Sequence, residues 1–151
     1  MLPDQLQSYL HQHIPLARAM QVSVLQVETG EVRLQAPFEP NINHQRTVFG
    51  GSAAALAMLA SWSLLQLRLQ AADIPAQLVI QRHTMDYALP IRGEFCARAS
   101  LLAQQRWDPF LAALARRGRA RVAVLALIEQ AQGVAARFTG EFVALAATPG
   151  L

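Results

Sequence analysis

One uncharged apolar run constrains what this chain of 151 residues can fold into. Residues 50–67 carry no charged side chain, and their length of 18 residues reaches the lower limit for a helix that spans a membrane. The run opens with two glycines, contains three serines and Gln66, and has no second span to pack against. We therefore expect a buried helix of a water-soluble fold, which starts at Gly50 or Gly51 and ends near Ala72, before Pro75.

Alternating apolar and polar residues on both sides of this helix predict strands. Thr29-Gly30 and Gln132-Gly133 are typical of turns between neighbouring strands. Asp108-Pro109 predicts the N-cap and first residue of a short helix that ends at Arg117, before Gly118. The predicted strands are 21–28, 31–36, 76–87, 93–103, 119–130 and 134–146, and a short amphipathic segment covers 5–13.

This order of elements predicts an α+β fold. A six-stranded antiparallel sheet can bury one face only if something lies along it, and the helix is the only long apolar segment available. We expect residues 1–151 to form a single domain in which the sheet wraps around a long central helix. A β-sandwich is less favoured, because the helix would have no place in it.

The amino-acid composition indicates which kinds of partner the chain is expected to bind. Apolar residues make up 53% of the chain and charged residues 15%, which predicts that a second subunit covers part of the surface. The net charge of +3 comes from scattered arginines without interleaved aromatics, so no nucleic-acid partner is expected. Arg119 and Arg121, which cluster with Arg116 and Arg117, are candidates for binding phosphates of a small ligand; a solvated helix end is the equal alternative.

The single cysteine and the N-terminus predict a cytoplasmic protein. Cys96 has no partner for an intrachain disulfide, and its place in an alternating apolar run predicts a small core residue. The N-terminal residues lack the basic and apolar regions of a signal peptide.

The loop before the helix carries a resemblance to a known family. Small acyl-CoA thioesterases of the hot-dog fold read Asn-x-x-x-Thr-x-His-Gly-Gly there, and Asn43, Thr47, Gly50 and Gly51 stand at those places. The chain resembles these proteins over essentially its whole length, and more narrowly the thioesterase domain at the C-terminus of YiiD-type acetyltransferases; PIRGEF is a weaker match. The resemblance implies an acyl-CoA or acyl-carrier thioester as substrate, no cofactor, and a homodimer or homotetramer.

Two positions depart from the family pattern. Phe49 replaces the histidine, and Met58 stands where those enzymes carry an Asp or Glu. The departure at Met58 leaves the general base open. Water is the expected nucleophile, because no Cys or Ser–His–Asp arrangement is visible. No second His or Cys lies at ligand spacing, so no metal site is expected.

The start of the helix is the first candidate site. The first amides of a helix have no intrahelical partner, that end is positive, and glycine permits close approach. A thioester carbonyl on the amides of Gly50, Gly51 or Ser52 would be polarised, as in an oxyanion hole. Close packing of the helix against a strand is the alternative reason for the glycines.

Side chains near this end supply the remaining candidates. Asn43 and His44 could position water, and His44 could accept its proton; a turn hydrogen bond and a solvated loop residue are the alternatives. Ser61 lies in a stripe of small residues and could act in an acyl groove, or bond back to its own helix. The expected catalytic residues are Asn43, His44, Gly51 and Ser61, and the expected substrate-binding residues are Thr47, Phe49, Gly50, Ser52, Met58, Tyr87, Arg119 and Arg121.

Strand alternation separates Asp86 from Tyr87. The strand 76–87 places Tyr87 on the same face as His83 and Met85, and Asp86 on the other. If the Tyr87 face meets the helix, Asp86 points outward and is a weaker candidate than Ser61.

Two other functions fit the same fold. A hydratase or dehydratase would need a His and a carboxylate across a dimer. A non-catalytic module that binds acyl thioesters or a partner is favoured by Met58 at the carboxylate position.

Overall fold

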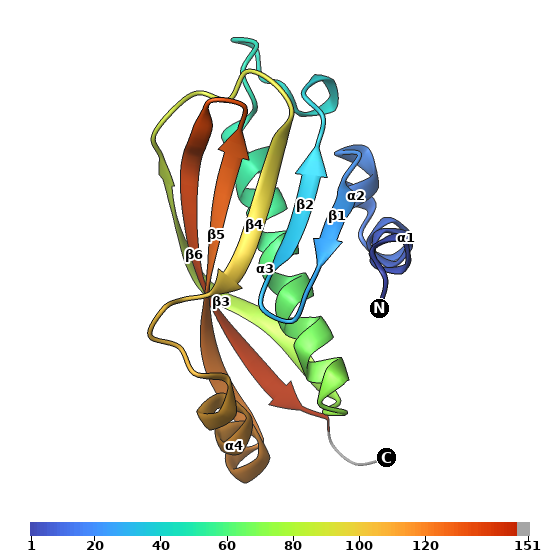
Figure 1. Cartoon of the computed structure of the whole chain (residues 1–151), viewed down its shortest axis with the longest axis vertical. Helices are drawn as coiled ribbons and strands as arrows, with labels where there is room; N and C mark the ends of the chain where they lie inside the picture. Colours follow the sequence, from blue (N-terminus) through green and yellow to red (C-terminus); the bar gives the residue numbers. More distant parts are fainter. Residues whose placement is uncertain (148–151) are drawn as a thin grey trace.

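A computed structural model of the chain describes residues 1–147 (Figure 1). Two helices come first, then two strands and a single 3-10 turn, then the long helix and the rest of the sheet. The elements are α1 (Pro3–His13), α2 (Pro15–Ala19), β1 (Ser23–Val27), β2 (Val32–Ala36), η1 (Glu39–Asn41), α3 (Gly50–Ala71), β3 (Ala76–Tyr87), β4 (Phe95–Leu101), α4 (Trp107–Arg117), β5 (Arg119–Gln130) and β6 (Gly133–Ala146).

The predicted order is confirmed, with three differences in detail. The short elements α2 and η1 were not expected; each has a proline in its first turn, Pro15 and Pro40, where the fixed φ of proline suits a helix. The predicted N-cap at Asp108 is wrong. Helix α4 begins at Trp107 with Arg106 as its N-cap, so Asp108 lies inside the first turn, where its charge favours the positive end of the helix.

The six strands form one antiparallel sheet in the order β1-β2-β4-β5-β6-β3. Helix α3 runs along one face and contacts β2, β3, β4, β5 and β6 (Figure 1). On this inner face the strands present apolar side chains at every second residue, with the pattern clearest in β2, β4 and β5. The expected sheet around a central helix is therefore confirmed.

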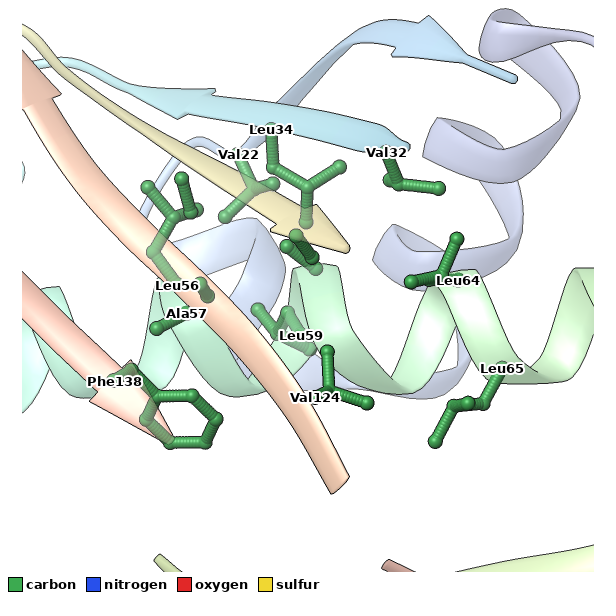
Figure 2. Packing of buried hydrophobic residues seen from close by; sticks show 14 of the residues in the cluster. Val22, Val32, Leu34, Leu56, Ala57, Leu59, Leu64, Leu65, Val124 and Phe138 are labelled. Carbon is green, nitrogen blue, oxygen red and sulfur yellow. The ribbon is translucent and has the colours of Figure 1, made fainter. Parts of the chain in front are cut away.

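The core lies between α3 and the inner face of the sheet. Figure 2 shows side chains of the sheet, among them Leu34, Val124 and Phe138, directed at α3. Helix α3 is long and apolar enough to cross a membrane by length and composition alone, yet half of its apolar window is buried inside the fold. Such burial is the expected state of a core helix that is apolar nearly all round.

The two edges of the sheet differ. Side chains of α1 cover the edge at β1: Gln7 Oε1 accepts a hydrogen bond from the Val24 amide at 3.0 Å, and His11 Nε2 donates to the Val22 carbonyl at 2.6 Å. The opposite edge is the outer side of β3, a strand of 12 residues. No element of residues 1–147 pairs with that side of β3, so its backbone groups are open to a further strand.

Cys96 does not lie in the core, contrary to the sequence-based expectation. Alternation in β4 puts Phe95 and Ala97 on the inner face and Cys96 on the outer face, where it is half-buried. Partial burial raises the pKa of the Cys96 thiol, and the nearby Arg33 offsets part of that effect. The prediction failed because two adjacent apolar residues do not reveal which of them points inward.

Gly140 is expected to tolerate no side chain. A Cβ there would lie 2.7 Å from the Phe138 ring and 3.1 Å from the Phe142 ring, and both rings are buried in the core. Gly140→Ala should therefore reduce the free energy of unfolding by about 1–3 kcal/mol through overpacking, measured by denaturant unfolding. Gly30→Ala is the matched control, because a Cβ at Gly30 meets no atom within 4 Å. Equal stability of the two variants would contradict close packing of Gly140 against the two phenylalanine rings.

Candidate functional site

Asn41 fixes the loop that leads into α3. Its side chain is buried, and Nδ2 donates to the carbonyl of Met20 at 3.0 Å and to that of Pro37 at 2.8 Å. Its backbone carbonyl accepts a hydrogen bond from the Phe49 amide at 2.8 Å. No sequence pattern points to Asn41, because its role depends on a carbonyl 21 residues away.

Asn43 closes the next turn of the same loop. Its Oδ1 accepts hydrogen bonds from the amides of Gln45 at 2.9 Å and Thr47 at 3.1 Å, and its Nδ2 donates to Thr47 Oγ1 at 2.9 Å. The Asn43 amide also donates to the Thr47 carbonyl at 2.8 Å. Asn43 and Thr47, which match the family pattern, thus hold each other in place. The second hydrogen of Asn43 Nδ2 has no acceptor among the described residues.

His44 lies at the tip of this turn. Its side chain is exposed, and no residue within 1–147 forms a hydrogen bond with it. Arg46 follows with a left-handed φ of 61° and forms an exposed ion pair with Glu39 at 3.8 Å. The imidazole of His44 is therefore available to a ligand or to solvent.

The start of α3 leaves two backbone amides unused. The Phe49 carbonyl accepts hydrogen bonds from the amides of Ser52 at 2.9 Å and Ala53 at 3.2 Å. The Ser52 amide, one of three expected in the oxyanion hole, is therefore already engaged. The amides of Gly50 and Gly51 have no acceptor in the described part of the chain, and they lie at the positive end of a helix of 22 residues.

Phe49 covers Gly51. The aromatic ring lies so close that a Cβ on Gly51 would be 2.4 Å from it, although 57% of Phe49 remains exposed. The absence of a side chain at Gly51 therefore lets the ring fold back over the helix start. Phe49 is the residue that replaces the histidine of the resembled thioesterases, so an apolar ring stands where those proteins carry an imidazole.

Tyr87 joins the end of β3 to the same helix start. Its hydroxyl donates to the Gly50 carbonyl at 2.8 Å, which confirms that the Tyr87 face of the strand meets the helix. Asp86 lies opposite Arg137 on the outer face and is exposed. A cavity of about 280 Å³ adjoins this contact, lined by Val48, Gly50, Ala53, Tyr87 and residues 88–91.

Ser61 and Met58 lie deeper along α3. Ser61 is fully buried, and its hydroxyl donates to the Ala57 carbonyl at 2.8 Å, the alternative that sequence analysis had left open. Ser61 is eleven residues beyond Gly50, roughly 16 Å along the helix axis. Met58 packs half-buried against the core. One chain does not bring Ser61 to the open amides.

Arg119 and Arg121 also lie far from the helix start. They begin β5, whose Ile128 pairs with Ala136, the residue that pairs with Tyr87. Ile128 lies nine positions beyond Arg119 in the strand, a distance of roughly 30 Å. A role for these arginines at the Gly50 and Gly51 amides would require a second chain.

The fold and the site together indicate the class of protein. A sheet that wraps around a long helix, with a glycine-rich helix start open to a ligand, is the arrangement expected of a hot-dog-fold thioesterase. The family model described as "Putative thioesterase (yiiD_Cterm)" matches residues 3–146, and the chain belongs to this family. Membership supports thioester hydrolysis as the general reaction.

Solved structures have the same fold. A protein of unknown function from Chlorobaculum tepidum is 25% identical with a TM-score of 0.88, and the match covers 96% of this chain and 94% of that one. A putative thioesterase from Shewanella oneidensis is 24% identical with a TM-score of 0.84 and coverage of 95% and 96%. A thioesterase from Haemophilus influenzae is 11% identical with a TM-score of 0.77 and coverage of 97% and 92%.

The contact between Tyr87 and Gly50 predicts a change of stability at high pH. Partial burial raises the pKa of the Tyr87 hydroxyl above its ordinary value of 10.0, so the folded state holds this proton more tightly than the unfolded state. Its contribution to stability is complete below pH 10.0 and is lost as the pH rises through the folded-state pKa. Unfolding measured across this range should show that loss in the wild type, and a smaller loss in Tyr87→Phe. Identical pH profiles would contradict the contact.

Proposed function

We propose that the protein hydrolyses an acyl-CoA or acyl-carrier thioester with water at the N-terminal end of α3. The observation that carries the proposal is the pair of unused amides at Gly50 and Gly51, at the positive end of the apolar core helix α3. Two such donors suit an oxygen that gains negative charge during acyl transfer. The apolar residues of α3 beyond them suit an acyl chain, since each buried methylene contributes roughly 0.8 kcal/mol.

The proposed step needs no covalent intermediate. A water oxygen bonds to the thioester carbonyl carbon while the carbonyl oxygen moves onto the amides of Gly51 and Gly50. His44 accepts the proton that the water loses, and the free hydrogen of Asn43 Nδ2 holds the water oxygen. The carbon–sulfur bond then breaks, and the leaving sulfur takes the proton from His44, so the products are a carboxylic acid and a thiol. Ser61, bonded to Ala57, has no part in this step.

The remaining residues near the site bind rather than react. Thr47 holds Asn43, Phe49 covers the helix start, and Tyr87 fixes the Gly50 carbonyl. Met58 and the side chain of Ser52 would contact the bound thioester. No cofactor is needed for this chemistry, and a CoA thioester as substrate, together with a single cysteine, supports a cytoplasmic location.

A non-catalytic acyl-binding module is the second candidate. Met58 supports it, because the family's carboxylate position cannot activate water in this chain. Turnover of a panel of acyl-CoA thioesters decides between the two. Binding without turnover would favour the module and overturn the hydrolase.

Replacing Gly50 tests the oxyanion site. Gly50→Pro removes the amide hydrogen at the first helical position, where proline is tolerated, and Phe49 with ψ of 131° already has the backbone that precedes proline. Gly50→Ala is the matched control, because it adds a comparable Cβ beside the Tyr87 hydroxyl and keeps the amide. Steady-state kinetics should show kcat of Gly50→Pro lower than that of Gly50→Ala by about 10²-fold or more. If the two variants have equal kcat, the Gly50 amide does not hold the oxyanion.

We also propose a homodimer, or a tetramer built from dimers, in which β3 of one chain lies beside β3 of another. The support is the open edge of this strand and the exposed apolar side chains on and near it, Val79, Tyr87, Leu89 and Leu145. A long unpaired edge is a template for pairing with another chain. The apolar composition of the chain has the same explanation.

A charge at this edge should separate the chains. Val79→Glu places a carboxylate on β3, where burial beside a second copy would cost free energy. Sedimentation equilibrium at micromolar concentration should give a dimer or tetramer for the wild type and a shift toward monomer for Val79→Glu. Leu25→Glu, an exposed site on the opposite edge strand β1, is the control and should leave the mass unchanged. A monomeric wild type would contradict the proposed assembly.

A further inference from the structure

A second cavity lies on the outer face of the sheet, at the same end as the start of α3. It has a volume of about 570 Å³. Its walls come from β2, the start of β4, the end of β5 and the turn between β5 and β6, and they carry arginine, glutamate and glutamine side chains. The mechanism proposed above makes no use of this cavity.

One short segment forms a wall of both cavities. Residues 87–91 line the cavity beside Gly50, and residues 92–96 line the outer cavity. Arg92 lies five positions after Tyr87, which contacts Gly50, so the Cα atoms of Tyr87 and Arg92 are at most about 18 Å apart. An extended pantetheine arm can therefore start at the helix and reach the outer cavity by crossing this segment.

The segment is held rigidly from both sides. The amides of Ala88 and Leu89 donate to the Ala135 carbonyl at 2.8 Å and 3.1 Å, and the Val48 amide donates to the Ile91 carbonyl at 2.8 Å. Its far end is held by the side chain of Gln130, which lies at the end of β5.

The Gln130 side chain forms hydrogen bonds with both ends of a short turn, Pro90 and Arg92. Its Nε2 donates to the Pro90 carbonyl at 3.0 Å, and its Oε1 accepts from the Arg92 amide at 3.2 Å. The position of Arg92 relative to the helix start is thus fixed by hydrogen bonds to its own amide and to the Pro90 carbonyl, and a fixed position is a condition for binding two ends of one ligand.

The charges in the cavity leave one arginine free. Arg33 contacts Glu31 at 3.4 Å and Glu129 at 3.9 Å, and Glu129 also bonds Arg98 at 3.0 Å. Arg92 has no carboxylate within ion-pair distance among residues 1–147. A free guanidinium suits a phosphate.

The rest of the lining suits the other groups of a nucleotide. Glu94 and the amide side chains of Gln35 and Gln132 also face the cavity. Carboxylate and amide groups match hydroxyl and amino donors, so the mixed lining fits a phosphorylated nucleoside better than a simple anion.

We propose that this outer cavity binds the phosphorylated nucleotide end of a CoA thioester, with Arg92 contacting phosphate and the pantetheine arm crossing residues 88–92. The inference rests on the proposed hydrolysis, and it places the phosphates here rather than at Arg119 and Arg121. It gives the substrate class as CoA thioesters, since a short thioester without a nucleotide leaves the cavity empty.

The test compares two thioesters of the same acyl group, one on CoA and one on N-acetylcysteamine, which lacks the nucleotide. Arg92→Gln should raise KM for the CoA thioester about tenfold with kcat little changed, and should leave kcat/KM for the short thioester unaffected. Gln132→Glu, an exposed turn position where the new charge would repel phosphate, should act in the same direction. Arg106→Gln, an exposed arginine at the other end of the sheet, is the control and should change neither substrate.

Calorimetric binding of desulfo-CoA separates failure of this inference from failure of the proposed hydrolysis. Binding by the wild type that weakens about tenfold in Arg92→Gln supports the cavity even if no thioester is hydrolysed. The inference is overturned if desulfo-CoA does not bind, if both cavity variants bind it like the wild type, or if the two thioesters lose activity equally. It is also overturned if Arg119→Gln or Arg121→Gln weakens binding and Arg92→Gln does not.

Discussion

Burial of α3 is the constraint on which the rest of the structure depends. An apolar helix with little polar surface must be covered on nearly all sides, and the inner face of the sheet supplies most of that cover. Burial cannot satisfy the first backbone amides of α3, because they have no hydrogen-bond partner within the helix. The place of the candidate site therefore follows from the way the core is built: the amides of α3 that remain open lie at its start.

The loop before α3 decides how many of those amides remain open. Asn41 and Asn43 hold the loop with side-chain hydrogen bonds, and Asn41 also fixes the Phe49 amide through its carbonyl. The Phe49 carbonyl then takes the amides of Ser52 and Ala53. Two adjacent donors, at Gly50 and Gly51, are left over. A pair of aligned donors that need no rearrangement is the arrangement that stabilises a developing negative charge most effectively.

Sequence patterns predicted the fold well because each element depends on its own residues. Alternation defines the strands, Pro75 and the glycines bound α3, and a period of two separates Tyr87 from Asp86. The same patterns predicted the direction of a side chain but not its burial. They predicted the side of α3 on which Ser61 lies, but they did not show whether that side is open. They also did not show which of Phe95 and Cys96 faces inward.

The features that sequence patterns missed all depend on distance through space. Asn41 bonds a carbonyl 21 residues away, and nothing in its neighbours predicts that partner. Arg119 and Arg121 matched a phosphate ligand by charge, but only the register of β5, β6 and β3 shows how far they lie from Gly50. The sequence did not indicate a role for Arg92, because that role depends on the two cavities that meet at residues 88–92.

Strand β3 is largely exposed, on its inner face as well as along its edge. His83 lies opposite Gly140 and stacks on the buried Phe138 ring with ring centres 5.4 Å apart, yet His83 remains exposed on the face that elsewhere meets α3. The same strand also has the uncovered edge. Because face and edge are open on one strand, a second chain beside β3 would cover both at once, and it would do so at the side of the molecule where Tyr87 meets the helix start. Assembly and site would then depend on the same strand, so a change that separates the chains should also disturb the amides at Gly50 and Gly51.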